Sequence, residues 1–237
     1  MYFRKVTLKI YYAKITAFSE EEMQQIMEIL PKERAERIGK IRLEKSRLQS
    51  VAAGLLLEHA LGRHGMQGKN LTFLKNPDGK PSIAEYPDFH YNLSHSKEYV
   101  VLVTDECPVG IDIEELRTGY QKLAARFFSQ EEAEVLKEHW SDDLFTKLWT
   151  RKESYLKAAG FGMRMPLDGF SVLEEQVRIN GKMPQAMIEP GAVYYIASVP
   201  FGTDSWLSVC RKGQPVILEQ DDTLLQEVEL KEILEKV

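Results

Sequence analysis

The chain has little cysteine and no long apolar run. Its two cysteines, Cys107 and Cys210, are too few in 237 residues for the disulfide framework of a small secreted protein, and no His or Cys group has the spacing of a zinc site. No apolar stretch approaches the ~20 residues that span a bilayer, and residues 1–10 lack the apolar core of a signal peptide. We therefore expect two reduced packing thiols in a soluble cytoplasmic protein.

The chain also lacks an excess of positive charge. The formal net charge is −5, which argues against a dedicated nucleic-acid binder, because such proteins carry a basic excess. A local basic pocket for a polyanionic small molecule is still compatible with this charge. Hydrophobic residues make up 43% and charged residues 28%, so a chain of this length can bury the core of one large domain or two small ones.

The hydrophobic pattern changes between strand and helix periods along the chain. Ser19 with Glu22 and Ser129 with Glu132 form two capping boxes, each of which predicts a helix start, and Pro31 interrupts the first of these helices. We expect strands at residues 6–15, 89–93, 99–103, 109–114, 193–199, 206–211 and 216–218, further helices at 44–59, 123–128, 144–159 and 224–237, and breaks at 76–79, 94–96 and 107–108.

Each half of this pattern consists of a strand, then helices, then strands. The natural boundary lies near residues 104–108. We predict an α+β fold with an N-terminal lobe at residues 1–106 and a C-terminal lobe at 107–237 that ends in a closing helix.

The segment Gly110 to Glu114 is acidic on one side only. In a strand, Ile111 and Ile113 face one side and Asp112 and Glu114 the other. Two carboxylates on one face can converge on a hard cation such as Mg²⁺, which takes oxygen ligands. The plainer interpretation is a half-buried strand with a solvated outer face, but acidic residues are disfavoured in strands.

The helix expected at residues 144–159 carries a second set of charged groups. Trp149, Glu153 and Lys157 recur at every fourth position and share one face, and Lys152 lies roughly 100° around the helix. The plainer interpretation is an exposed Glu–Lys pair beside a core Trp. In the functional one, Glu153 completes a metal site and accepts a proton, and Lys157 offsets charge on a phosphate.

Several polar residues suit phosphate binding. Ser94 and His95 lie in an NLSHS segment, and Lys80 follows a rigid turn. Each is equally compatible with an ordinary polar turn. A hydrolase pair of Ser94 and His95 is disfavoured, because adjacent strand residues point apart and no G-x-S-x-G elbow is present. The run of bases from 32 to 47 alternates with glutamates, which is typical of a solvated helix face.

The order of these motifs is more specific than any one of them. Residues 79–81 (GKP), 92–96 (NLSHS), 110–114 (GIDIE), 126–129 (RFFS) and 149–157 (WTRKESYLK) follow one another as in the 4′-phosphopantetheinyl transferase superfamily. The chain resembles the larger, surfactin-synthetase-activating (Sfp) type. The resemblance runs from about residue 19 to 199 and is loose over the last forty or so residues.

This resemblance implies a monomeric pseudo-dimer of two similar lobes, with coenzyme A in the cleft between them. It implies transfer of the 4′-phosphopantetheine arm of coenzyme A to a serine of an apo acyl or peptidyl carrier protein, with release of 3′,5′-ADP and no nucleic-acid or membrane partner. By the same resemblance, the Mg²⁺ ligands are Asp112, Glu114 and Glu153, with Glu153 also the base and Lys157 the assistant of the leaving group. The implied coenzyme A contacts are Lys80, Ser94, His95, Lys152 and Lys157, with Lys45 or Arg47 on the 3′-phosphate.

The chain departs from the family pattern just after Pro31. Family members often carry lysines there, whereas this stretch alternates bases with Glu33 and Glu36. The helix that contains Lys45 and Arg47 aligns in more than one register. Two other functions are compatible with the same carboxylates and lysine. One is a Mg²⁺-dependent phosphodiesterase that uses water as nucleophile, and the other is a catalytically silent coenzyme A-binding protein.

Overall fold

The computed structural model describes residues 7–66, 71–218 and 224–235. Its first half contains β1 (Lys9–Lys14), α1 (Glu20–Ile29), α2 (Lys32–Gly39), α3 (Glu44–Arg63), β2 (Phe73–Lys75), β3 (Pro81–Ile83), β4 (His90–Ser96) and β5 (Tyr99–Asp105). The second half contains β6 (Val109–Glu115), α4 (Gln121–Phe127), α5 (Gln130–Glu138), α6 (Asp142–Ala159), β7 (Phe170–Ser171), β8 (Arg178–Ile179), β9 (Tyr194–Phe201) and β10 (Ser205–Lys212). The chain then continues through β11 (Leu225–Glu227) and α7 (Leu230–Leu234).

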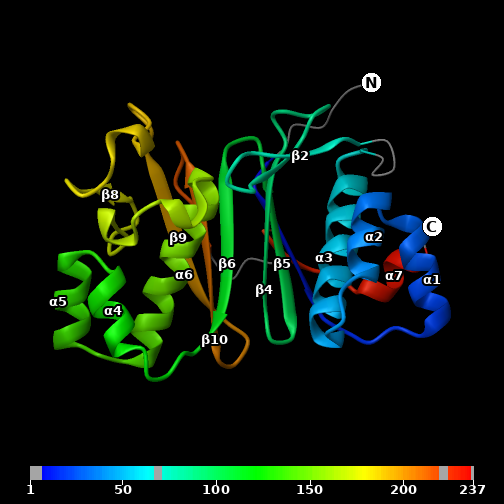
Figure 1. Ribbon diagram of the computed structural model, residues 1–237, viewed down its shortest axis with the longest axis horizontal. Helices are drawn as coiled ribbons and strands as arrows, with labels where there is room; N and C mark the ends of the chain where they lie inside the picture. Colours follow the sequence, from blue (N-terminus) through cyan, green and yellow to red (C-terminus); the bar gives the residue numbers. More distant parts are fainter. Residues whose placement is uncertain (1–6, 67–70, 219–223, 236–237) are drawn as a thin grey trace.

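Two sheets stand at the centre of the molecule, with helices outside each of them (Figure 1). The first sheet has the strand order β11-β1-β5-β4 and the second has the order β6-β10-β9. In Figure 1, α1 to α3 lie outside the first sheet and α4 to α6 outside the second. The mixture of helix and sheet agrees with the predicted α+β class.

Strand alternation divides the apolar side chains among three cores. On β1, Ile10 belongs to the core between the sheets, whereas Tyr11 and Ala13 belong to the core beneath α3. On β6, Ile111 and Ile113 face the central core. The period-2 pattern of side-chain direction therefore leaves the other face of β6, which carries the acidic residues, to α6.

Local sequence signals set the helix starts. Both predicted capping boxes are present: the Ser19 hydroxyl accepts from the Glu22 amide and the Ser129 hydroxyl from the Glu132 amide, and each Glu side chain returns to the cap. Pro31 separates α1 from α2, as predicted.

The C-terminal segment departs from the predicted division of the chain. β11 pairs in parallel with β1 of the first sheet, with Ile10 opposite Leu225, and α7 packs among the N-terminal helices, as Figure 1 also shows in red. The buried face of α7, which includes Leu230 and Ile233, joins the first-half core. A lobe at 107–237 closed by its own helix is therefore wrong for residues 224–235.

Two smaller predictions were also wrong. Residues 94–96 continue β4 rather than breaking it, because hydrogen bonds to β6 engage their polar side chains. Residues 216–218 form no strand. Residues 6, 236 and 237 of the predicted first strand and last helix lie outside the described residues. None of the described helices is long and apolar enough to cross a membrane.

A missing side chain brings α6 against β6. A Cβ atom built on Gly110 would lie 2.2 Å from the Ser154 carbonyl oxygen and 2.4 Å from the Ala158 amide nitrogen. Only glycine permits this approach of strand to helix backbone. The close contact carries Lys157 over the acidic face of β6.

Candidate active site

The edge strand β4 joins the first sheet to β6 through side chains on one of its faces. The Asn92 carboxamide oxygen accepts a hydrogen bond from the Ile111 amide at 3.0 Å, and the Ser96 hydroxyl accepts one from the Glu115 amide at 3.2 Å. Between them, Ser94 donates to Asp112 Oδ1 at 2.8 Å. Residues at 92, 94 and 96 share a strand face, so the NLSHS segment connects the halves of the molecule.

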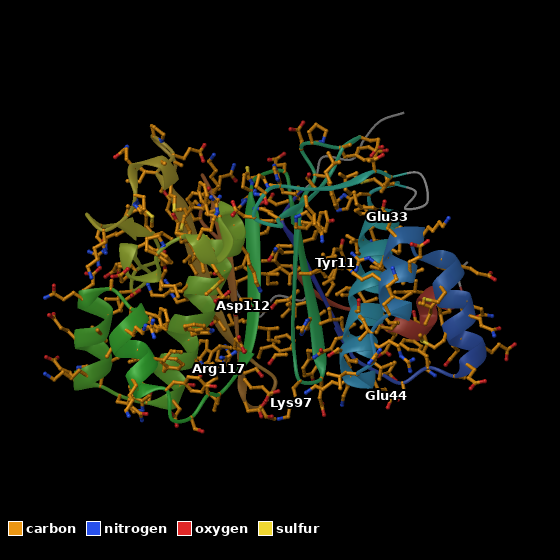
Figure 2. The ribbon with its side chains drawn as sticks, in the orientation of Figure 1. Tyr11, Glu33, Glu44, Lys97, Asp112 and Arg117 are labelled. Atoms are coloured by element: carbon orange, nitrogen blue, oxygen red, sulfur yellow. The ribbon has the colours of Figure 1, made fainter. Side chains whose placement is uncertain are left out.

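Asp112, Ser94 and Lys157 form one hydrogen-bonded group. Lys157 Nζ lies 2.6 Å from Asp112 Oδ1 and donates to Ser94 Oγ at 2.9 Å and to the Ile111 carbonyl at 3.2 Å. Asp112 is 3% exposed, and its second oxygen, Oδ2, is buried with no hydrogen-bond partner among the described residues. Figure 2 labels Asp112 on β6, next to α6.

Glu153 completes the group from one helical turn before Lys157. Burial and, to a smaller extent, the negative charges of Asp112 and Glu114 together raise the pKa of Glu153 to about 7, against the opposing charge of Lys157. Burial also raises the pKa of Glu114. Three carboxylates from β6 and α6 thus lie near enough to influence one another electrostatically.

A cation that sequence reasoning missed lies against Glu114. Arg117 donates through Nη2 to Glu114 Oε1 at 2.5 Å and through Nε to Oε2 at 3.3 Å. Its guanidinium also lies over the Tyr120 ring at 5.6 Å and the Trp149 ring at 5.7 Å, an arrangement that favours a flat cation. Figure 2 labels Arg117 below Asp112. The sequence signal for Arg117 is a base three residues after Glu114, together with Trp149 on the helix that packs against the strand.

The turn between β2 and β3 holds the end of α6. Lys80 Nζ donates to the Ala158 carbonyl, the Asn76 side chain donates to the Gly160 carbonyl at 2.8 Å, and Arg164 forms an ion pair with Asp78. Burial lowers the pKa of Lys80 to about 8. Lys80, the predicted phosphate contact, is therefore present at the site, but its ammonium bonds to the carbonyls of Ala158 on α6 and Val109 on β6.

The helix α3 contributes one of its two candidate bases. The pKa of His95 is lowered by partial desolvation of its ring and by Lys157, with a smaller effect from Lys45. Lys45 therefore lies within electrostatic reach of His95. Arg47 is exposed and lies about 200° further around the helix, so the two bases cannot face the same point.

A pocket of about 180 Å³ opens beside these groups. Its wall includes Lys80 and Asn92 from the first half and Glu153, Lys157 and Gly160 from the second. Both halves of the chain therefore line the pocket that contains the candidate base and the candidate cation.

Comparison with known proteins gives the same family for both halves. Residues 17–107 match the family model described as 4′-phosphopantetheinyl transferase, N-terminal, and residues 108–191 match the 4′-phosphopantetheinyl transferase superfamily. A 4′-phosphopantetheinyl transferase of Bacillus subtilis is 33% identical over 171 residues, which cover 70% of this chain and 76% of the relative. The chain belongs to the 4′-phosphopantetheinyl transferase superfamily.

Other relatives extend across bacteria and animals. The 4′-phosphopantetheinyl transferase Sfp of Bacillus subtilis strain 168 is 31% identical over 173 residues, 71% of this chain and 77% of the relative. The L-aminoadipate-semialdehyde dehydrogenase-phosphopantetheinyl transferase of Homo sapiens is 28% identical over 167 residues, 62% of this chain and 53% of the relative. The predicted resemblance to Sfp-type 4′-phosphopantetheinyl transferases, which are transferase enzymes, is confirmed.

One predicted contact of this transferase site was wrong. Lys152 is 0% exposed and lies 2.7 Å from Glu132 Oε2, with further bonds to the carbonyls of Leu167 at 2.8 Å and Phe170 at 2.9 Å. All three donors of the ammonium are used inside the second half. Lys152 therefore cannot contact coenzyme A, and its place in the motif is structural.

The predicted metal ligands are near one another but are not assembled. Within residues 7–66, 71–218 and 224–235, no three acidic, His or Cys side chains form a group that could hold a metal ion. Lys157 contacts Asp112, and Arg117 contacts Glu114. Two protein cations thus lie against the carboxylates that the sequence assigns to Mg²⁺.

Proposed function

We propose that this transferase moves the 4′-phosphopantetheine group of coenzyme A to a serine of an apo acyl or peptidyl carrier protein, with 3′,5′-ADP as the leaving group. The main support is that Glu153 and Lys157 line one pocket with residues from both halves of the chain, and that Lys157 bonds to Asp112 beside it. Carboxylates and an ammonium beside a pocket suit a reaction at a pyrophosphate, whose barrier is largely electrostatic.

The architecture part of the proposal is a monomeric pseudo-dimer of two lobes, divided near residues 106 and 107, with coenzyme A between them. Each sheet begins with a strand that is followed by three helices and then by further strands, which supports two similar units. In our proposal residues 224–235 close the first unit rather than the second. Because one chain supplies both walls of the pocket, no second copy is needed to complete the site.

The oxygen chemistry of this group suits Mg²⁺, although the three carboxylates would have to draw together and exchange their contacts with Lys157 and Arg117 to hold it. Asp112 Oδ2 is a buried carboxylate oxygen without a partner among the described residues, and burial together with two neighbouring acids raises the pKa of Glu153. Hard divalent cations take such oxygens. Asp112, Glu114 and Glu153 would hold the ion, which when bound would neutralise the pyrophosphate charge and align it for attack.

The protein groups have distinct tasks in this proposal. Glu153 accepts the proton of the attacking serine hydroxyl, for which a pKa of about 7 is well matched to physiological pH. Lys157, whose ammonium lies 2.6 Å from Asp112 Oδ1, stabilises the negative charge of the departing phosphate. Ser94, whose hydroxyl bonds to Asp112, would donate to the phosphate oxygens instead, and Lys80 would meet them from the wall of the pocket.

The 3′-phosphate contact in the proposal is Lys45 with His95. Lys45 is the base of α3 that acts on His95, whereas Arg47 lies on a different side of the helix. The proposal thus takes Lys45 from the two alternatives that the sequence leaves open. A Lys45→Met variant should weaken binding of coenzyme A more than binding of 3′-dephospho-coenzyme A, and Arg47→Met should affect both equally or neither.

The carrier is proposed to dock near residues 126–129. A groove of about 590 Å³ lies between α4 and α5 there, with Phe128, Leu136 and Trp140 in its wall. Apolar helix grooves of this kind accept a helix of a partner. Replacing Arg126 by Glu should raise KM for the carrier, and an unchanged KM would count against this docking position.

The decisive experiment is intact-mass analysis of a panel of apo-carrier proteins after incubation with coenzyme A and Mg²⁺. A mass gain equal to phosphopantetheine on the carrier serine is expected. A parallel sample without carrier separates the alternatives, because hydrolysis of coenzyme A there would identify a phosphodiesterase. Binding of coenzyme A without turnover on any carrier would identify the silent protein.

A further inference from the structure

A separate cavity of about 380 Å³ lies in the second half of the molecule. Its walls come from the end of α6 and from the segments that lead into and out of β8, with Tyr155, Phe161, Val177, Met187 and Tyr194 among them. The lining is mainly apolar and aromatic, as is typical of small-molecule sites. None of the residues that form the candidate active site contributes to it.

Two tyrosines line this cavity. Tyr155 is 3% exposed and Tyr194 is 9% exposed, and their rings pack edge to face with centroids 5.1 Å apart. Among the described residues, neither hydroxyl has a hydrogen-bond partner, yet neither is among the buried polar atoms that are closed off from solvent. Each hydroxyl therefore keeps some access to solvent, and its residue lines the cavity, so we infer that it supplies a polar group to an otherwise apolar wall.

The wall of the cavity offers no unpaired charge. Glu189 is the acidic residue in the wall, and it forms an ion pair with Lys212. A charged ligand would therefore find no free counter-charge in the cavity, whereas an uncharged ligand needs none. The apolar wall fits an aliphatic or aromatic body, and the two hydroxyls fit a single hydroxyl or amide on it.

We propose that this cavity is a second ligand site, which takes a small uncharged molecule with an apolar body and one hydroxyl or amide group. The site is independent of the transferase pocket. Ala159 and Phe161 line the cavity, whereas the alternate residues Gly160 and Gly162 line the transferase pocket. The segment 159–162 is thus a wall with one pocket on each side.

The test uses two probes of similar shape, p-cresol and toluene, titrated into the full-length protein and followed by amide chemical shifts. Saturable shifts around the cavity are expected with both, and p-cresol should bind several-fold more tightly. The variant Tyr155→Phe/Tyr194→Phe keeps the shape of the wall and should abolish this preference while still binding toluene. Tyr86→Phe, in the first half, is the matched control and should keep it.

Three results would overturn the proposal. The first is the absence of saturable binding by either probe to the wild-type protein. The second is an unchanged preference for p-cresol in the double variant, whose folding is checked by its thermal unfolding. The third is displacement of p-cresol by coenzyme A, which would make the cavity part of the transferase pocket; retention of both ligands together supports a second site. None of these readouts depends on transfer to a carrier.

Discussion

The two sides of α6 each carry a lysine, but the two lysines have different environments and different roles. Lys152 faces the interior of the second half, is 0% exposed and bonds to Glu132 and two carbonyl groups. Lys157 faces β6, keeps 27% of its side chain exposed and contacts Asp112 and Ser94 beside a pocket. An ammonium whose donors are all used in a sealed core is structural, whereas one at a pocket can exchange its partner for a ligand.

The acids on the two sides differ in the same way. Glu132 accepts from Lys152 Nζ at 2.7 Å, from the Ser129 amide at 2.8 Å and from the Val172 amide at 2.8 Å. Glu153 has no hydrogen bond within the described part of the chain, and burial beside two other acids raises its pKa to about 7. On the interior side of α6, the charged groups of Lys152 and Glu132 have hydrogen-bond partners. On the side toward β6, Glu153 is an acid whose ionised form is disfavoured by its surroundings.

The largest expected effect is on the side of α6 toward β6. Glu153→Gln should lower the rate of single-turnover transfer by about 10²- to 10⁴-fold, because the amide cannot accept the serine proton. Intact-mass time courses at saturating coenzyme A and carrier measure this rate. Glu21→Gln, an exposed acid of α1, should leave it unchanged; equal rates in all three proteins would remove Glu153 from the reaction.

The interior side should respond in stability instead. Lys152→Met leaves the fully buried Glu132 without its counter-charge, which should lower the free energy of unfolding by about 3–5 kcal/mol. Adding Glu132→Gln should restore part of the loss, because the remaining charge is removed. Urea unfolding measures both. Lys157→Met, whose partner is at a pocket, should cost less than Lys152→Met, and the reverse order would invalidate the contrast between the two sides.

A smaller effect should follow from separating the helix from the strand. Gly110→Ala places a methyl group within 2.4 Å of backbone atoms of α6, so it should cost about 1–3 kcal/mol of unfolding free energy by overpacking. It should also slow transfer, since Asp112 and Lys157 move apart. Gly62→Ala is the control: its Cβ meets nothing within 4 Å, so it should be neutral or stabilising in α3. A neutral Gly110→Ala would mean that the close approach is not required.

The residues that share the side of α6 toward β6 could be predicted from the sequence, whereas the partners of the residues on its interior side could not. Period-2 spacing separates Asp112 from Ile111, and fourfold spacing aligns Glu153 with Lys157. Both rules describe one element and its own faces. Which neighbour Lys152 meets depends on residues 132, 167 and 170, whose positions follow only from the packing of other segments.

Long-range pairing explains the other differences. β11 joins β1 across more than two hundred residues, and no local pattern specifies such a partner. The NLSHS segment appears as a turn because it is polar. Its polar residues at 92, 94 and 96 nevertheless recur with the period of a strand, and hydrogen bonds to β6 satisfy them. That alternation is a signal that predicts the strand.

The smallest expected effect is the pH dependence that Glu153 gives to the free energy of unfolding. The pKa of Glu153 is about 7 in the folded protein and 4.5 without the fold, so the folded state binds more protons between these values and its stability falls as pH rises through that window. Glu153→Gln cannot lose a proton, so at pH 8 and without Mg²⁺ it should be more stable than wild type by about 1–2 kcal/mol, which allows for partial solvent screening. At pH 4 the two proteins should unfold at similar urea concentrations. A stabilisation of equal size at both pH values would show that the effect comes from packing rather than from charge, and Glu153 would then no longer differ from Glu132 in the way that the two sides of α6 require.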